Sequence, residues 1–217
     1  MLHNGFYDVF APMETPRLRI RKLGIGDAED IFAFSQNPEV SRFVLWDAHR
    51  SIADSRSMVR SALRAYRMGE PASLAIELRE TGRVVGTIGF VWIDDEHNCA
   101  EIGYSLAQEY WGRGLMTEAL RAMLEFAFVR LHLNRVEAMF DVRNRASGRV
   151  MEKCGMRREG LLRQKLYNKG EYVDVEIWAI LARDRRFRVP ARFETMQAAW
   201  FRETCGAPNP GKRAFRP

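Results

Sequence analysis

Residues 108–115 read Gln-Glu-Tyr-Trp-Gly-Arg-Gly-Leu, and this stretch joins an alternating segment to a long apolar one. Gly112 and Gly114 stand two positions apart, where the chain turns from a strand into a helix. Glycine lets the backbone approach a ligand closely, and the first N–H groups of a helix have no partner within it. Together with the positive end of the helix dipole, these groups form an anion site whose shape suits a pyrophosphate.

The segments on either side of this turn have different periods. Residues 100–106 alternate as a strand does, whereas residues 115–131 are apolar on nearly every side, as in a covered helix. One face of the strand carries Ala100, Ile102, Tyr104 and Leu106, and the other carries Glu101, Gly103 and Ser105. The helix keeps one solvated stripe, formed by Glu118, Arg121 and Glu125. The sequence therefore predicts a strand, a tight turn and a buried helix, in that order.

The same two periods and the capping residues mark the other elements. Asp27 and Ser51 are each followed by an acid three residues later, which predicts two helix starts. Expected helices cover 28–36, 52–68, 115–131 and 147–154, and expected strands cover 17–21, 73–78, 84–93, 100–106, 136–142, 161–167 and 172–181. Because strands alternate with helices after an antiparallel start, we expect a mixed α/β sheet with a central parallel pair of strands, flanked by helices.

Charge is divided unevenly along the 217 residues. Residues 1–182 hold 25 Lys and Arg against 25 Asp and Glu, so the net charge of +6 falls in residues 183–217. A neutral body argues against a fold built around nucleic acid, apart from weak binding through the basic tail. The helical spacing of Phe193, Met196 and Trp200 allows one more helix over 190–205, with a mobile end after it.

Composition and cysteine spacing exclude several other classes. A chain that is 47% hydrophobic and 29% charged is typical of a globular protein and not of a disordered one. Three cysteines without a C-x-x-C pattern favour reduced thiols in the cytoplasm over disulfides or a zinc site. The first residues do not resemble a signal peptide, and no apolar run reaches the ~18 residues of a membrane span. No histidine has a partner four residues away, so no metal site is expected.

Five motifs follow one another along the chain. They are Glu101-Ile-Gly-Tyr-Ser-Leu106, Trp111-Gly-Arg-Gly114, Asn144-Arg-Ala-Ser147, Glu152-Lys-Cys-Gly-Met156 and Lys169-Gly-Glu-Tyr-Val-Asp174. In this order the chain resembles the GNAT superfamily of acetyl-CoA-dependent N-acetyltransferases, and within it the RimJ/RimL type, which acetylates amino termini of ribosomal proteins. The resemblance covers roughly residues 14–184, which leaves a leader at 1–13 and a basic extension at 185–217. Trp111, Met116 and Met156 depart from the superfamily pattern.

This resemblance implies both the fold and the acetyl donor. The strand at 101–106 would split from the one at 136–142, and acetyl-CoA would lie in the gap with its pyrophosphate on the glycine loop. The amine would enter from the opposite face, near the first two helices. Residues expected to bind acetyl-CoA are Tyr104, Ser105, Leu106, Trp111, Gly112, Arg113, Gly114, Leu115, Met116, Thr117, Asn144 and Ser147. No metal takes part.

The reaction needs a neutral amine. At pH 7, deprotonation costs about 1 kcal/mol for a chain α-amine and about 4.6 kcal/mol for a lysine, so an α-amine needs only a modest base. Glu101 is the expected base, because it lies on the site-facing side of its strand. An N–H near Tyr104–Ser105 is the expected oxyanion donor. By resemblance, Ser147 returns a proton to the leaving thiolate, with Tyr104 or Tyr110 in reserve.

These residues also have simpler structural interpretations. Glu101 can be a strand acid paired with an arginine, and Ser147 can cap the helix that follows. Asn144 can be a loop residue with a left-handed backbone, and Trp111 can be a packing residue. The segment 46–49 can pack on the first helix instead of lining the substrate pocket. Both sets of interpretations stay open at this point.

The predicted function is acetyl transfer from acetyl-CoA to a primary amine, with a protein amino terminus as the expected acceptor. One alternative is acetylation of a small amine, such as a polyamine or an aminoglycoside-like compound. Another is a non-catalytic acyl-CoA-binding module that contacts a partner through its basic tail. A homodimer also stays open, because closed symmetric oligomers are common among soluble proteins.

Overall fold

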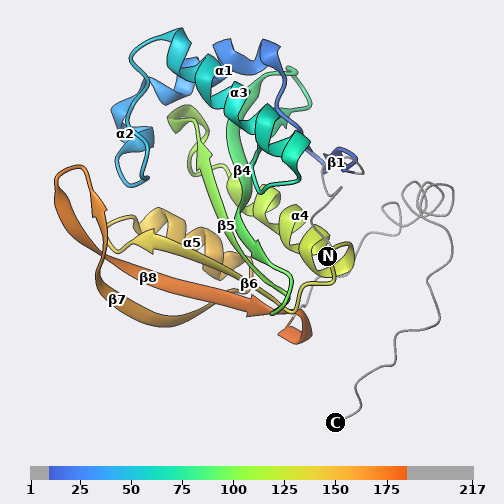
Figure 1. Ribbon diagram of the computed structural model, residues 1–217, viewed down its shortest axis with the longest axis vertical. Helices are drawn as coiled ribbons and strands as arrows, with labels where there is room; N and C mark the ends of the chain where they lie inside the picture. Colours follow the sequence, from blue (N-terminus) through green and yellow to red (C-terminus); the bar gives the residue numbers. More distant parts are fainter. Residues whose placement is uncertain (1–9, 185–217) are drawn as a thin grey trace, which may run out of the picture. The chain divides into compact units, whose positions relative to one another are not determined.

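A computed structural model describes residues 10–184 of the chain. Its sheet has eight strands in the order β1-β2-β3-β4-β5-β6-β8-β7 (Figure 1). The strands are β1 (Met13–Glu14), β2 (Leu18–Arg21), β3 (Ser73–Leu78), β4 (Val84–Asp94), β5 (Cys99–Leu106), β6 (Arg135–Asp141), β7 (Arg157–Asn168) and β8 (Glu171–Leu181). Neighbouring strands are antiparallel except for β5 and β6, which are parallel. This mixed sheet with a central parallel pair confirms the fold class expected from the sequence.

Helices cover both faces of the sheet. They are α1 (Ala28–Ser35), α2 (Pro38–Ser41), α3 (Ile52–Met68), α4 (Leu115–Val129) and α5 (Arg145–Lys153), with short 3-10 turns η1 (Ile25–Asp27), η2 (Gln108–Tyr110) and η3 (Ala182–Asp184). In Figure 1, α1 and α3 lie in front of the sheet, and α4 and α5 lie behind it. The α4 helix is buried on most sides, as its apolar sequence predicts, and it reaches solvent along the stripe of Glu118, Arg121 and Glu125 and, in part, at Ala122, Phe126 and Val129.

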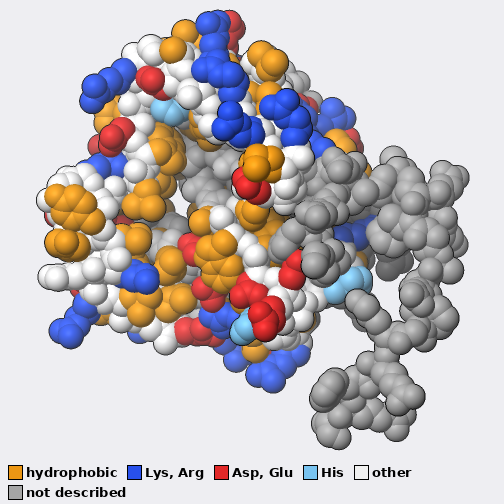
Figure 2. Space-filling view, in the orientation of Figure 1, with side chains coloured by type: hydrophobic (Ala, Val, Ile, Leu, Met, Phe, Trp, Pro, Cys, Tyr) orange, Lys and Arg blue, Asp and Glu red, His pale blue; other side chains and the backbone are white. Residues whose placement is uncertain are grey.

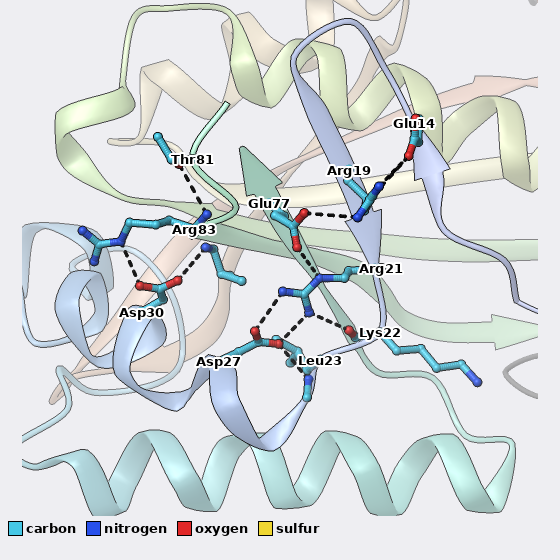
Figure 3. Close-up of polar contacts among 12 residues, drawn as sticks. Glu14, Arg19, Arg21, Lys22, Leu23, Asp27, Asp30, Glu77, Thr81 and Arg83 are labelled. Carbon is cyan, nitrogen blue, oxygen red and sulfur yellow. Dashed lines mark hydrogen bonds and ion pairs between the residues drawn. The ribbon is translucent and has the colours of Figure 1, made fainter. Parts of the chain in front are cut away.

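A charged network joins the first strands to the first helical turn (Figure 3). The Arg21 guanidinium on β2 contacts Glu77 on β3 at 2.5 Å and Asp27 in η1 at 2.7 Å. Asp27 also accepts a hydrogen bond from the Gly24 N–H at 2.7 Å. Asp27 stands at the N-cap position of α1, as expected, but its side chain makes no capping hydrogen bond to that helix, because the carboxylate is engaged with the preceding η1 turn and with Arg21.

The limits of α3 and the positions of two hairpins agree with the sequence prediction. The Asp54 carboxylate accepts from the N–H groups of Arg50 and Ser51 at 2.9 and 3.0 Å, which confirms the predicted start of α3. That helix ends at Gly69, whose φ of +70° is left-handed. The β3–β4 and β7–β8 hairpins lie where they were expected.

Both expected domain boundaries lie near the ends of the described residues. The β1 strand begins at Met13 and so crosses the expected boundary between leader and domain. The helix expected over 190–205 lies outside the described residues, and the boundaries at 13/14 and 184/185 stay predictions. Within residues 10–184, no helix combines the length and apolar character needed to cross a membrane.

Candidate active site

The parallel strands β5 and β6 pair at one end and then diverge. Their pairs run from Cys99 with Arg135 to Glu101 with Glu137, whereas β5 continues to Leu106. Because β4 stays paired with β5, and β8 with β6, the sheet opens into a gap (Figure 1). This gap confirms the splay expected for the central strand pair.

The edge of β5 along the gap carries backbone groups directed into it. In an antiparallel pair, hydrogen-bonded and non-hydrogen-bonded residues alternate. The Ala107 N–H donates to the Val85 carbonyl at 2.8 Å, so Ser105, two residues earlier, also directs its backbone at β4. Tyr104 then directs its N–H and C=O the other way, into the gap. Of the two N–H groups expected near the oxyanion, the one of Tyr104 faces the gap.

The glycine loop has a conformation that requires glycine. Gly112 and Gly114 have φ values of +74° and +76°, in the left-handed region. A Cβ on Gly112 would meet nothing within 4 Å, and one on Gly114 would meet only an Arg17 nitrogen at 3.7 Å. The loop surface is therefore open to a ligand. The next residues, Leu115, Met116 and Thr117, are buried, and their N–H groups belong to the first turn of α4. These open donors fit an anion such as a pyrophosphate.

Glu118 ties this loop to the start of the domain. Its carboxylate accepts from the Thr15 hydroxyl at 2.6 Å and from the Arg17 backbone N–H at 2.9 Å. The Arg17 guanidinium contacts the same carboxylate at 2.7 Å and donates to the Arg113 carbonyl at 2.9 Å. Burial alone would raise the pKa of the Glu118 carboxyl, but the bonds from Thr15 and Arg17 outweigh it and hold the pKa below its usual value.

Trp111 and Arg113 lie on the outer side of the loop. Trp111 is 45% exposed, more than a packing residue would be. Its indole N–H donates to the Leu106 carbonyl at 2.7 Å, which covers the last carbonyl of β5. The Arg113 guanidinium lies over the Tyr110 ring, 5.3 Å from its centroid. Both side chains are therefore held by groups at the end of β5 or in the connection between β5 and α4.

Two hydroxyl groups meet behind the sheet. The Tyr104 hydroxyl on β5 lies 2.9 Å from the Ser147 Oγ on α5 and 3.3 Å from the Ser147 carbonyl oxygen. Burial raises the pKa of the Tyr104 phenol, so the phenol keeps its proton at neutral pH. The structure thus brings together the expected proton donor and one of its two reserves.

The helix that carries Ser147 begins earlier than expected. The α5 helix starts at Arg145, and Asn144 is its N-cap, with its Oδ1 accepting from the Ser147 N–H at 3.3 Å. The interpretation of Ser147 as the N-cap is therefore wrong, because Asn144 takes that position first. Asn144 has φ of −85°, so it is not left-handed either. Its cap uses the amide oxygen and leaves the Nδ2 hydrogens for other contacts.

Glu101 stands at the last β5–β6 pair, where the strands diverge. It is three residues from Tyr104, so the two side chains lie on opposite faces of β5. Its Oε2 accepts from the Trp92 indole N–H at 2.7 Å. Burial raises the pKa of the Glu101 carboxyl, the Trp92 bond opposes this, and the negative charge of Glu137 adds to the rise. Within residues 10–184, no arginine forms an ion pair with Glu101, so that interpretation is wrong.

Sequence reasoning missed the residues that hold Glu101 and Glu118. Trp92 lies opposite Glu101 in the β4–β5 pairing. A bulge between Phe90 and Trp92 shifts the register, so a regular hairpin register taken from the sequence does not predict this pair along the whole hairpin. Thr15 and Arg17 carry no motif at all. As for metals, residues 10–184 contain no group of three or more His, Cys, Asp or Glu placed to hold an ion.

Comparisons with known proteins agree with this geometry. A family model described as an acetyltransferase (GNAT) domain matches residues 17–157. The uncharacterized N-acetyltransferase YoaA of Bacillus subtilis (strain 168) is 35% identical over 173 residues, which cover 80% of this chain and 98% of that protein. The ribosomal protein uS5-alanine N-acetyltransferase of Escherichia coli (strain K12) is 32% identical over 88 residues, or 41% of this chain and 45% of that protein.

Solved structures give the same result. A crystal structure of a GNAT-family acetyltransferase from Bacillus anthracis has a TM-score of 0.72 and 29% identity, and the match covers 80% of this chain and 99% of that one. The family match spans more than half of the chain, and it includes the gap, the glycine loop and α5. This chain therefore belongs to the GNAT family, and it is an N-acetyltransferase that takes its acetyl group from acetyl-CoA.

Proposed function

We propose that the acceptor of this acetyltransferase is the α-amine of a protein amino terminus. The observation that carries the proposal is the carboxylate of Glu101 at the apex of the gap, held by the neutral donor Trp92 at 2.7 Å. Burial raises the pKa of this carboxyl, so its carboxylate is a base, and an amine that is already partly neutral at pH 7 needs only a modest one. The Escherichia coli relative, named for the alanine of ribosomal protein uS5, lends further support.

Glu101 removes the proton from the incoming amine. The α-amine has a pKa of about 7.7–8.0, so its deprotonation at pH 7 costs only about 1 kcal/mol. Burial raises the pKa of Glu101, which makes its carboxylate a stronger base than an exposed glutamate. The carboxylate takes the proton directly or through one water. The same deprotonation of a lysine acceptor would cost about 4.6 kcal/mol at pH 7.

Tyr104 and Ser147 act on the other face of β5. Acetyl-CoA supplies the acetyl group as an activated thioester. The Tyr104 N–H, which points into the gap, is placed to stabilise the oxyanion. As the bond between the acetyl carbon and sulfur breaks, the Ser147 hydroxyl gives its proton to the leaving sulfur and the Tyr104 phenol, 2.9 Å away, reprotonates Ser147; water that enters when coenzyme A leaves returns a proton to Tyr104. Proton removal and proton return thus occur on opposite faces of one strand.

The backbone groups around Gly112 and Gly114 bind the pyrophosphate in this proposal. Their φ values and the open space outside Gly112 allow a phosphate oxygen to approach the main chain. Tyr104, Ser105 and Leu106 lie along the pantetheine arm, and the Asn144 Nδ2 approaches it from the opposite side. Trp111 and Arg113 border the phosphates.

The test is thiol release from acetyl-CoA with a panel of acceptors. Peptides with varied first residues and a free amino terminus are compared with the same peptides blocked at that terminus and carrying one lysine. Spermidine and an aminoglycoside represent small amines. We expect the free-terminus peptides to have the highest kcat/KM. Preference for the blocked peptides or for a small amine would overturn the assignment of the acceptor, although not that of the donor.

A further inference from the structure

The gap between β5 and β6 is closed at both of its ends. At one end the two strands pair through Glu101 and Glu137. At the other end the β7–β8 hairpin extends beyond the last residue of β6, Asp141, and its turn holds Lys169. Lys169 reaches across to the connection between α2 and α3 (residues 42–51), which belongs to the β5 side of the gap.

Every hydrogen-bond donor of the Lys169 ammonium group has an acceptor. Its Nζ donates to the carbonyl oxygens of Val44 at 2.7 Å and Trp46 at 3.2 Å, and to the Asn168 Oδ1 at 3.3 Å. An ammonium group has three donors, and all three have acceptors here. The Asp47 carboxylate lies 3.9 Å away and adds an opposite charge. This is a specific bridge, unlike the single loose contact that is common for surface lysines.

The α2–α3 connection is itself fixed to the β5 side. The His49 N–H donates to the Ser35 carbonyl on α1 at 3.0 Å, and the His49 Nδ1 lies 2.7 Å from the Ser55 Oγ on α3. Asn37, which directly precedes α2, donates from its Nδ2 to the Oε1 of Gln108, just beyond the end of β5, at 2.6 Å. The segment 46–49 thus contacts both α1 and α3, and the bridge joins two anchored parts.

The hairpin is fixed to the β6 side in turn. Arg143, two residues beyond β6, contacts Asp141 at 2.6 Å and Glu171 in β8 at 2.7 Å. Its guanidinium also lies 5.9 Å from the Phe43 ring of the α2–α3 connection. Lys169 and Arg143 therefore both make contacts across this end of the gap. Figure 2 shows a deep hollow on this face of the molecule, bordered by hydrophobic side chains.

We propose that Lys169 closes the gap into a ring, and that this ring makes Lys169 a specificity-determining residue. The inference rests on the proposed acceptor side and deepens it. A closed ring admits an acceptor end first and excludes one that must slide in from the side. A chain terminus with small first residues passes, whereas bulky first residues collide with the rim at Phe43, Trp46 and Lys169. The exclusion of peptides with bulky first residues then depends on the contacts of Lys169 with Val44 and Trp46.

The test replaces Lys169 by Met, which keeps the length of the side chain and removes its three donors. The acceptors are two peptides that begin with Ala-Ala or Trp-Trp, and the readout is the ratio of their kcat/KM values. In the wild type we expect a strong preference for Ala-Ala. In Lys169→Met we expect this ratio to fall by about fivefold or more through a gain with Trp-Trp, with acetyl-CoA affinity unchanged. Lys169→Arg, which keeps the charge, should retain most of the preference.

Lys153→Met is the matched control, since Lys153 is an exposed lysine at the end of α5 on the other side of the sheet. Thermal unfolding checks that each variant is folded. An unchanged ratio in folded Lys169→Met, or an equal loss with both peptides, would overturn the ring proposal. If the wild type acetylates no peptide, the proposed acceptor fails, and the ring is then tested by the same ratio with an unbranched and a branched small amine.

Discussion

The donor side and the acceptor side of the gap are built in different ways. On the proposed donor side, backbone groups are the expected ligand contacts: the N–H groups after Gly112 and Gly114, and the edge of β5 at Tyr104. On the acceptor side, side chains from distant segments meet, as when Lys169 bonds to Val44 and Trp46. The comparison teaches that main-chain recognition tolerates changes of side chain, whereas acceptor recognition is set residue by residue. Met116 illustrates the first case, because it departs from the superfamily pattern but still supplies a backbone N–H to the first turn of α4.

The largest expected effect is on kcat, and it comes from a change on the acceptor side that leaves acetyl-CoA binding unaltered. Glu101→Gln should lower kcat at pH 7 by about 100-fold, because general base catalysis typically contributes 10²–10⁴-fold and an α-amine needs the least help. Acetyl-CoA affinity should stay the same. The defect should shrink toward pH 9, where the amine is neutral without a base. Rates measured with one free-terminus peptide across pH check this, and wild-type turnover at pH 7 would contradict the role of Glu101.

Trp92→Phe tests the same base through the pH dependence of kcat/KM. The Trp92 bond lowers the pKa of Glu101, so its removal should raise that pKa further. Because the base must be ionised, the acid limb of the kcat/KM profile should move to higher pH, with little change on the alkaline side. A shift toward lower pH would show that the titrating group is another one.

The second effect addresses the donor side alone. Gly114→Val should weaken acetyl-CoA binding at least tenfold, measured by calorimetry, because a β-branched residue is strained at its φ of +76° and would shift the backbone N–H groups that are expected to bind the pyrophosphate. Gly82→Val is the control, since Gly82 has a similar φ of +69° but lies in the β3–β4 turn, outside residues 108–115. Equal affinity in both folded variants would remove the pyrophosphate assignment.

A smaller effect is expected at Asn144, which has two tasks. Asn144→Ala should raise the KM for acetyl-CoA about fivefold, the worth of one hydrogen bond of about 1 kcal/mol, and loss of the cap should destabilise the protein by a further ~1 kcal/mol. Asn144→Asp keeps the capping oxygen and loses the Nδ2 donor, so it should raise KM and leave stability nearly intact. A rise in the KM of the amine alone would place Asn144 on the acceptor side.

The smallest effect concerns the support of the loop. Glu118→Gln should lower the free energy of unfolding at neutral pH by about 1 kcal/mol, since Arg17 is half exposed and its charge is screened. The pKa of Glu118 is lower in the folded protein, so its contribution is present above the ordinary glutamate pKa and is lost as the pH falls through the lowered value. Denaturant unfolding at two pH values measures this. A loss that persists at low pH would mean that packing, and not charge, stabilises the site.

The two sides also differ in how well the sequence predicts them. The strand, turn and helix at 100–131 could be predicted because their periods and glycines are local signals, and the order of motifs points to the donor. The partners of Glu101 and Glu118 could not, because a bulge displaces Trp92 and because Thr15 lies about a hundred residues from Glu118 in the chain. The helix start at Arg145 was misplaced because Asn144 and Ser147 are both good caps, and only the structure shows which one caps. The bridge of Lys169 has no sequence signal.

The most direct test of the account is a crystal structure of the product complex, with coenzyme A and an acetylated peptide bound together. The account predicts coenzyme A in the gap, with its pyrophosphate within hydrogen-bonding distance of the N–H groups of residues 113–117 and its sulfur beside Ser147. It predicts the acetylated nitrogen on the opposite face, near Glu101, with the peptide threaded under Lys169. Coenzyme A outside the gap, or both ligands entering from one face, would contradict it.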